Sequence, residues 1–156
     1  MTMHLAAAPK PTIIDWNDQQ YRILLAADAS EGRLGAFESI VPPNGGPPRH
    51  YHQNEDEFFY VLEGETVFWL EGATMTKKAG EAMLIPRGKE HTFTAVGSTR
   101  ARLVATVTPG GFEGFFAKVS ARGLRIPEDL SEVAKLSAEY GMIVTGPPLH
   151  LASPET

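Results

Sequence analysis

The sequence contains no cysteine. Disulfide bonds, thiolate nucleophiles, zinc fingers and iron–sulfur clusters are therefore excluded as sources of stability or of chemistry. Any metal ion bound by the chain must take its side-chain ligands from histidine and from carboxylates. The chain has five histidines among its 156 residues, so their spacing decides whether a metal site can be predicted.

The sequence also lacks an excess of basic charge. Its 14 lysine and arginine residues are outnumbered by 19 aspartate and glutamate residues, which gives a formal net charge of -5 at pH 7. Such a chain offers no basic surface large enough to neutralise a run of phosphates. We therefore expect no nucleic-acid partner.

Long apolar runs are absent as well. No segment approaches the ~20 apolar residues that a membrane-spanning helix requires. The run LAAA at residues 5–8 is too short for the apolar core of a signal peptide. From these two features we expect no membrane partner and a cytoplasmic location.

Short β-favouring runs alternate with turn residues from position 21 to position 119. The runs are YRILLAA, LGAFESIV, EFFYVLEG, TVFWLE, ATMTKKA, EAMLIP, HTFTAV, ARLVATVT and FEGFFAKV. Closely spaced short strands are typical of a β-sandwich or β-barrel. The pairs Glu63-Gly64 and Glu71-Gly72 favour tight hairpins, so we predict an all-β fold with antiparallel pairing.

The hydrophobic period changes after these runs. In PEDLSEVAKLSAEYG the apolar residues recur at helical spacing, and Gly141 is a typical helix stop. We predict a short C-terminal helix followed by an extended segment, MIVTGPPLHL, the two together covering about residues 127–150. The length and composition are those of one globular domain, which we place at residues 1–156.

Four residues of metal-ligand type stand in two short segments. His50 and His52 are separated by one residue, so their side chains lie on the same face of an extended strand. Glu57 follows the polar, turn-prone QNED, which lets the chain return a carboxylate to the two imidazoles. His91 begins the β-run HTFTAV, which an antiparallel fold can place beside the first segment. We predict that the four side chains converge, as three nitrogens and one oxygen, on one divalent ion.

Other candidate residues are assigned structural roles. Glu55 and Asp56 belong to a carboxylate run that is typical of a solvated turn, so we place them outside the ligand set. We expect His4 and His150, near the termini, to be solvated. Five aromatic residues lie in the core, at a subunit interface or along a pocket for a flat substrate: Phe58, Phe59, Tyr60, Phe68 and Trp69.

The spacing of these residues resembles two signature motifs of the cupin superfamily. The first is H-x-H-x4-E-x6-G, at His50, His52, Glu57 and Gly64; the second is G-x5-P-x-G-x2-H, at Gly80, Pro86, Gly88 and His91. The resemblance implies a double-stranded β-helix, a jelly-roll barrel, over about residues 21–119, with both histidine motifs supplying the metal ligands.

Two positions depart from the family pattern. Asn44 stands where the first motif opens with glycine, although Gly45 and Gly46 follow it, and Ala95 stands where the second motif closes with asparagine. Neither position supplies a ligand. The departures therefore affect the expected loop geometry rather than the expected metal binding.

Three further segments, DEFFYVLEGE, TPGGFEGFF and GMIVTGPPL, resemble the single-domain cupins grouped with quercetin 2,3-dioxygenases. This resemblance implies an enzyme that uses dioxygen on a flavonol or another small enolic or aromatic hydroxy compound, with Glu57 as the catalytic base. The expected cofactor is one divalent transition metal, and three imidazoles with one carboxylate suit Fe, Mn, Ni, Co, Cu or Zn.

Two other functions stay open. A non-catalytic cupin that binds or senses a small molecule through its metal would use the same ligands, because a fold does not determine a function. A carbohydrate isomerase would also use them, but it should have a polar pocket, and the aromatic residues near the first motif argue against that. We also predict a homodimer, since both faces of the strands around residues 58–62 and 67–70 are apolar.

Overall fold

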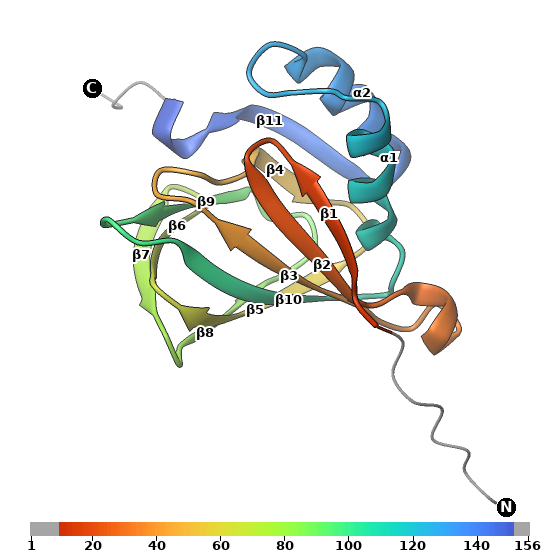
Figure 1. The fold of residues 1–156 in the computed structure, drawn as a ribbon, viewed down its shortest axis with the longest axis horizontal. Helices are drawn as coiled ribbons and strands as arrows, with labels where there is room; N and C mark the ends of the chain where they lie inside the picture. Colours follow the sequence, from red (N-terminus) through yellow and green to blue (C-terminus); the bar gives the residue numbers. More distant parts are fainter. Residues whose placement is uncertain (1–9, 152–156) are drawn as a thin grey trace, which may run out of the picture.

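The structure is a computed structural model that describes residues 10–151, so His4 lies outside the described residues. Within this range two antiparallel sheets face each other as a jelly-roll sandwich (Figure 1). The six-stranded sheet has the order β1-β2-β3-β10-β5-β8, and the five-stranded sheet has the order β11-β4-β9-β6-β7. The all-β prediction is confirmed.

The strands are β1 (Thr12–Trp16), β2 (Gln19–Leu25), β3 (Gly35–Val41), β4 (Pro48–His52), β5 (Asp56–Glu63), β6 (Glu65–Leu70), β7 (Ala73–Lys78), β8 (Ala82–Ile85), β9 (His91–Val96), β10 (Ala101–Thr108) and β11 (Met142–Pro148). The helices are α1 (Phe115–Ala121) and α2 (Leu130–Glu139), with short 3-10 helices η1 (Ala27–Ser30), η2 (Phe112–Gly114) and η3 (Leu149–Leu151). No helix in the described part of the chain is long and apolar enough to cross a membrane.

Strand β5 shows how residue alternation builds the core. Glu57, Phe59 and Val61 point between the sheets and are at most 3% exposed. Their neighbours Phe58 and Tyr60 point outward and are 43% and 40% exposed. The predicted division of faces is therefore correct, and in the single chain the outer face stays open to solvent.

The two predicted hairpins have different outcomes. Glu71 and Gly72 join β6 to β7 as a two-residue hairpin, with Leu70 paired to Ala73. Both turn residues have positive φ, 48° and 92°, as a twist-matched hairpin turn requires. The Glu63-Gly64 pair instead carries the chain from the six-stranded sheet to the five-stranded sheet, because β5 and β6 belong to different sheets.

The prediction of a strand at FEGFFAKV is wrong, because this segment forms η2 and α1. The buried residues Phe112, Phe115, Phe116 and Val119 follow one another at three-, one- and three-residue steps, which is the spacing of one helix face. The last strand before this segment therefore ends at Thr108, and the first strand begins at Thr12, ahead of the predicted start.

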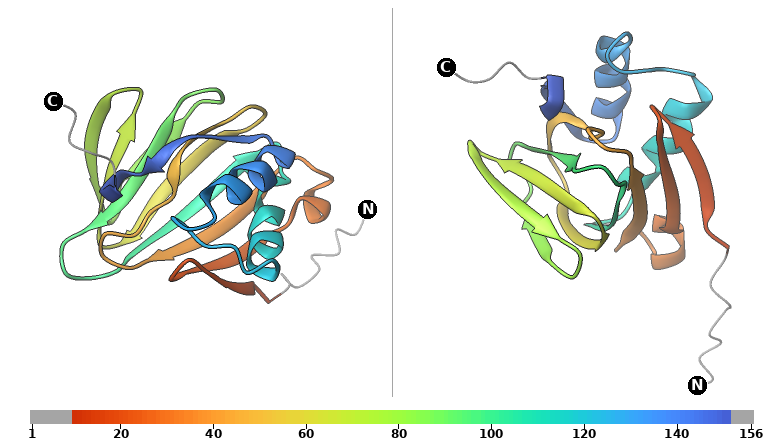
Figure 2. Two further views of the ribbon diagram at one scale, coloured as in Figure 1. Left: turned by 90° about the horizontal axis from the view of Figure 1, so that it is seen from above. Right: turned by 60° about the vertical axis from the view of Figure 1, so that its left-hand side comes forward.

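The C-terminal elements agree with the prediction. Helix α2 buries Val133 and Leu136, and β11 follows directly after Gly141. Strand β11 pairs with β4, so that Met142 lies opposite His52. Figure 2 shows α1 and α2 together at one end of the sandwich, away from the β6–β7 hairpin. The C-terminal segment thus reaches the strand that carries two predicted ligands.

One departure from the family motifs, Asn44, lies in the loop before β4, and the other, Ala95, lies in β9. Asn44 has a φ of 63°, in the left-handed region that asparagine tolerates better than most residues. Its backbone N–H donates to the carbonyl of Ala95 at 2.8 Å, and the Ala95 N–H donates to the carbonyl of Gly45 at 3.0 Å. The two departing positions are thus joined through their backbones, which pins the loop onto β9.

Gly46 in this loop lies directly against β9. A Cβ atom at this position would overlap the carbonyl oxygen of Phe93. Strand β9 cannot easily move away, because it is paired with β4 on one side and β6 on the other. We therefore predict that Gly46→Ala lowers the free energy of unfolding by about 3 kcal/mol, the upper end of the usual range for overpacking.

Urea denaturation measures this change, with Gly97→Asn as the control. Gly97 has a φ of 85°, which asparagine tolerates, and no atom lies within 4 Å of the position that a Cβ would take. Asparagine should therefore be accepted there with little loss of stability. Equal stability losses in the two variants would contradict the proposed contact with Phe93.

Candidate metal centre

The four predicted ligand residues come from three strands on both sheets. His50 and His52 lie on β4, His91 is the first residue of β9, and Glu57 is near the start of β5. His50 and His91 are directly paired across β4 and β9. One ligand atom from each of the four residues lies within 4.8 Å of the other three, and all four side chains are buried. The structure therefore brings together the whole predicted set.

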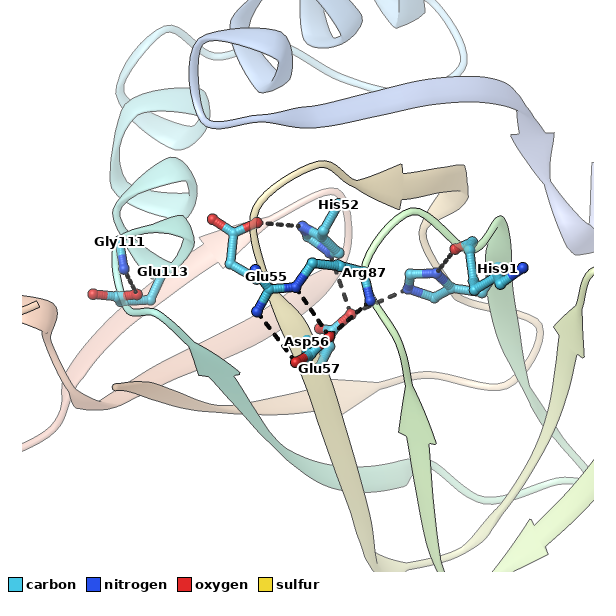
Figure 3. A network of polar contacts seen from close by, with 9 residues as sticks. His52, Glu55, Asp56, Glu57, Arg87, His91, Gly111 and Glu113 are labelled. Atoms are coloured by element: carbon cyan, nitrogen blue, oxygen red, sulfur yellow. Dashed lines mark hydrogen bonds and ion pairs between the residues drawn. The ribbon is translucent and has the colours of Figure 1, made fainter. Parts of the chain in front are cut away.

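The carboxylate of Glu57 lies at the centre of this cluster. Its Oε2 is 3.1 Å from Nε2 of His91 and 3.2 Å from Nε2 of His52. In Figure 3 the dashed lines from both imidazoles meet at Glu57. The five-stranded sheet thus supplies the nitrogens, and the six-stranded sheet supplies the oxygen that faces them.

The contacts of the outward-facing nitrogens show which nitrogen of each ring is free to bind a metal. Nδ1 of His50 lies 2.7 Å from the carbonyl of Pro48, and Nδ1 of His91 lies 2.9 Å from the carbonyl of Lys89. A carbonyl only accepts hydrogen bonds, so Nδ1 must carry the proton in both rings. Each Nε2 then keeps its lone pair for a metal.

Burial and mutual proximity shift the pKa values of these groups. Burial, together with the nearby His91 and His52, lowers the pKa of His50 well below its usual value. Burial would also lower the pKa of His52, but the charge of Glu57 and the contact with Glu55 outweigh it and raise that pKa to about 9. Without a metal, His52 therefore carries the proton that a bound cation would displace.

Glu57 is ionised in the same setting. Burial would raise its pKa, but the charge of His52 and the close contacts with His52 and His91 outweigh burial and hold the pKa well below the usual range. A buried carboxylate without compensating positive charge would be strongly destabilising. The cluster therefore favours a cation at its centre.

The donor set fits a divalent transition metal. Within residues 10–151, neither ring nitrogen of His52 has a hydrogen-bond partner of good geometry, although both are buried. Buried polar atoms of this kind call for an explanation such as a bound ion. Three imidazole nitrogens and one carboxylate oxygen match the ligand preferences of zinc and the neighbouring transition metals.

The two carboxylates before Glu57 differ from the prediction. Asp56 lies at the surface, where it forms an ion pair with Arg87 at 3.2 Å, but Glu55 is buried, with 5% exposure. The expectation that Glu55 belongs to a solvated turn is wrong. Residues 55, 56 and 57 alternate between the inside and the outside, so Glu55 turns in beside Glu57. His150 is exposed, as expected.

A small, partly open cavity of about 40 Å³ adjoins the cluster. His50 and Glu57 line it on the side of the candidate ligands, and aromatic residues form most of its other walls: Trp16, Tyr21, Phe37, Phe59, Phe93, Phe112, Phe115 and Phe116. Of the five aromatic residues named from the sequence, Phe59 lies here, whereas Phe68 is fully buried in the core. The helical spacing of Phe112, Phe115 and Phe116 is the signal in the sequence that could have identified these residues as part of the cavity wall.

Helix η2 closes this cavity next to the histidines. The ring of Phe112 meets that of His52 edge-on, with 4.6 Å between centroids. The neighbouring Glu113 is buried, and its carboxylate accepts hydrogen bonds from the backbone N–H groups of Ala27 at 2.6 Å and Gly111 at 2.8 Å. These bonds fix η2 over the end of the sandwich.

Comparison with known proteins agrees with this geometry. Residues 37–107 match the family model described as a cupin domain. Over this range the chain is a cupin domain. The matched range contains all four residues of the cluster, and the expectation drawn from the two histidine motifs is confirmed at the level of the family.

Curated cupin relatives differ in what their names describe. The chain is 30% identical over 99 residues to quercetin 2,3-dioxygenase of Bacillus subtilis, a match that covers 64% of this chain and 29% of that protein. It is 29% identical over 113 residues to polyketide synthase CurC of Streptomyces cyaneus, covering 72% of each. It is 29% identical over 85 residues to the oxalate-binding protein of Thermotoga maritima, covering 54% of this chain and 70% of that one.

Solved structures support the fold over a longer range. The Streptomyces nucleoside dehydratase Pac13 superposes with a TM-score of 0.62 at 12% identity, covering 99% of this cupin and 100% of that chain. At this identity the likeness concerns the fold alone. The chain spans less than a third of the quercetin 2,3-dioxygenase that it matches, 29%.

The geometry predicts how metal binding depends on each imidazole. His91→Ala removes one nitrogen ligand, and the surrounding apolar residues cannot supply another. We expect the apparent affinity for Zn²⁺ to fall by more than about 100-fold, since losing a residue that only supports a ligand already costs 10–100-fold. Competition with a chromophoric chelator measures the affinity.

His150→Ala is the matched control, because this histidine is exposed and lies outside the cluster. It should bind Zn²⁺ like the parent protein. Parent-like binding by the His91→Ala variant would show that the ion is held elsewhere.

Proposed function

We propose that this cupin binds one divalent transition metal, one of Fe, Mn, Ni, Co, Cu or Zn, through His50, His52, Glu57 and His91. We propose further that it acts as a dioxygenase on a flavonol or another small enolic or aromatic hydroxy compound. The observation that carries the proposal is the buried cluster of three imidazoles and one carboxylate at the end of an aromatic cavity. The likeness to quercetin 2,3-dioxygenase supports the reaction class.

In this proposal the three histidines bind the metal, and Glu57 also acts as a base. A divalent ion held there would lower the pKa of a substrate hydroxyl and stabilise the anion that forms. The three imidazoles are held by β4 and β9 of the five-stranded sheet with their Nε2 atoms toward one point. Glu57 faces the imidazoles from the other sheet, so its oxygen is placed to accept the hydroxyl proton as the substrate anion forms.

The aromatic walls of the cavity would orient the substrate and exclude water from the reacting groups. Rings such as Phe37 and Phe59 suit the face of a flat, apolar substrate and exclude water from the reacting groups. This lining argues against a carbohydrate substrate, whose hydroxyls would lack partners there. The cavity of about 40 Å³ is much smaller than the roughly 300–1,000 Å³ of pockets for drug-sized ligands. A flavonol therefore requires the side chains of η2 and α1 to move aside, and a smaller hydroxy compound requires less.

The same small cavity favours a second candidate, a non-catalytic cupin that binds or senses a small molecule through its metal. The oxalate-binding protein of Thermotoga maritima supports this alternative by its name. In this case the residues of the cluster hold a ligand without changing it. The two candidates differ in whether the ligand is consumed.

Oxygen uptake separates the two candidates. The protein is reconstituted with each of the six metals and mixed with a panel of flavonols, catechols and small enols. The dioxygenase proposal predicts oxygen consumption matched by loss of one substrate class. Absence of consumption with every metal would rule out this reaction on these compounds, and tight binding without turnover would support the sensing module.

Glu57→Gln tests the base separately from the metal. The amide keeps the shape of the side chain and the three imidazoles remain, so we expect the variant to retain much of its metal. Turnover should fall by a factor of about 10²–10⁴, the usual contribution of a positioned general base. Metal content and oxygen uptake are measured on the same samples.

Two outcomes would contradict this role of Glu57. Full metal binding with a parent-like rate would remove Glu57 from the mechanism. Loss of metal as severe as in His91→Ala would reduce it to a structural ligand.

We also propose that two copies of the chain form a dimer through the outer face of β5 and β8. Four large apolar residues are exposed there, Phe58, Tyr60, Leu62 and Leu84, with exposures between 40% and 58%. Phe58 and Leu84 are directly paired across the two strands, so they form one continuous surface. Apolar surfaces of this kind usually mark an interface, and β8 lies at the edge of its sheet.

Light scattering after size exclusion tests the dimer. The parent protein should run at twice the mass of the chain at micromolar concentration, and Leu62→Lys should shift it to the monomer by placing a charge in the apolar surface. Ile13→Lys is the control, because Ile13 is 57% exposed on β1, at the opposite edge of the sheet. A monomeric parent protein would refute the dimer.

A further inference from the structure

The three histidines of the cluster are held from outside by two kinds of group. His50 and His91 each point Nδ1 at a backbone carbonyl two residues earlier in the chain, that of Pro48 and that of Lys89. Among residues 10–151, His52 has no such carbonyl partner. Its Nδ1 faces Oε2 of Glu55 at 3.5 Å, so its outer partner is a carboxylate.

The carboxylate of Glu55 is buried and faces the imidazole of His52. Its side chain is 6% exposed and that of His52 is 2% exposed. In the described part of the chain its Oε2 has no hydrogen-bond partner of good geometry. Arg87, the nearby cation at the surface, instead pairs with Asp56 at 3.2 Å (Figure 3). A carboxylate taken out of water in this way is retained only where it meets a hydrogen-bond donor.

The ring of His52 is confined on another side as well. Phe112 packs edge-on against it at a centroid distance of 4.6 Å, with an interplanar angle of 76°. The imidazole thus lies between an aromatic ring and a carboxylate, while Nε2 points at Glu57. Rotation of the ring would break the contact with Glu55 and turn Nε2 away from the cluster.

We propose that Glu55 is a positioning residue of the metal centre: its carboxylate accepts the Nδ1–H of His52, which directs Nε2 to the metal and strengthens it as a donor. The inference rests on the proposed metal binding by the cluster. A carboxylate behind a ligating histidine fixes its tautomer and raises its basicity, and loss of such a partner costs 10–100-fold in metal affinity. His52 therefore becomes the strongest nitrogen donor of the three.

Zn²⁺ affinity tests the proposal in four proteins: the parent, Glu55→Ala, Glu55→Gln and Asp56→Asn. We expect Glu55→Ala to bind about 10–100-fold more weakly. Glu55→Gln should recover part of the loss, because its amide oxygen still accepts the Nδ1–H but carries no charge. Asp56→Asn removes the same charge one residue away, on the solvent side, and should bind like the parent.

Nitrogen NMR of labelled histidine in the Zn²⁺-loaded proteins gives a second readout. The parent should show His52 with a protonated Nδ1 and a metal-shifted Nε2, and the Nδ1–H resonance should move in Glu55→Gln while those of His50 and His91 stay in place. A general loss of stability would not produce this selective change. The Gln variant, which keeps the size of the side chain, provides the answer if the Ala variant does not fold.

Parent-like affinity in Glu55→Gln together with unchanged His52 resonances would overturn the role of Glu55, while leaving the metal centre intact. Equal losses in Asp56→Asn and Glu55→Gln would overturn it too, because the effect would then be one of net charge. A parent protein that takes up no Zn²⁺ would overturn the metal centre itself, and the inference with it.

Discussion

A carboxylate and three imidazoles are buried together between two otherwise apolar sheets, and much of the surrounding structure serves to compensate their loss of hydration. None of these side chains is more than 4% exposed. The compensation comes from specific groups: backbone carbonyls hold the outer nitrogens of His50 and His91, and Glu55 faces that of His52. Without a metal, a proton on His52 balances the charge of Glu57. A divalent ion would replace that proton and satisfy all four inward atoms at once.

This constraint accounts for the position of several elements. Strands β4 and β9 must pair so that His50 and His91 meet, and β5 must start opposite them to present Glu57 from the other sheet. The segment after β10 then closes the end of the sandwich, where η2 sets Phe112 against His52. The result is a small space beside the cluster with mostly aromatic walls, and such low-polarity surroundings strengthen electrostatic interactions. The size of that space, more than the ligands, limits which molecule can act there.

The sequence was informative wherever the spacing of residues determines the direction in which their side chains point. One residue between His50 and His52 predicts a shared strand face, and the alternation in β5 predicts which side is buried. It was less informative where two patterns overlap. The apolar residues of FEGFFAKV resemble a strand by composition, although their spacing is helical, and the structure forms α1 there. Glu55 was missed because a run of three carboxylates suggests a solvated turn, and its burial depends on how the turn enters β5. The short β1, far from the motifs, carries no comparable signal.

The central claim is that one metal ion lies among His50, His52, Glu57 and His91. Anomalous scattering from crystals of the metal-loaded protein tests it most directly, because the signal at the absorption edge locates the ion without reference to the ligands. The account predicts a single strong peak at about 2.0–2.2 Å from the three Nε2 atoms and one oxygen of Glu57. A peak outside the cluster, or coordination through Nδ1 of any of these histidines, would contradict it.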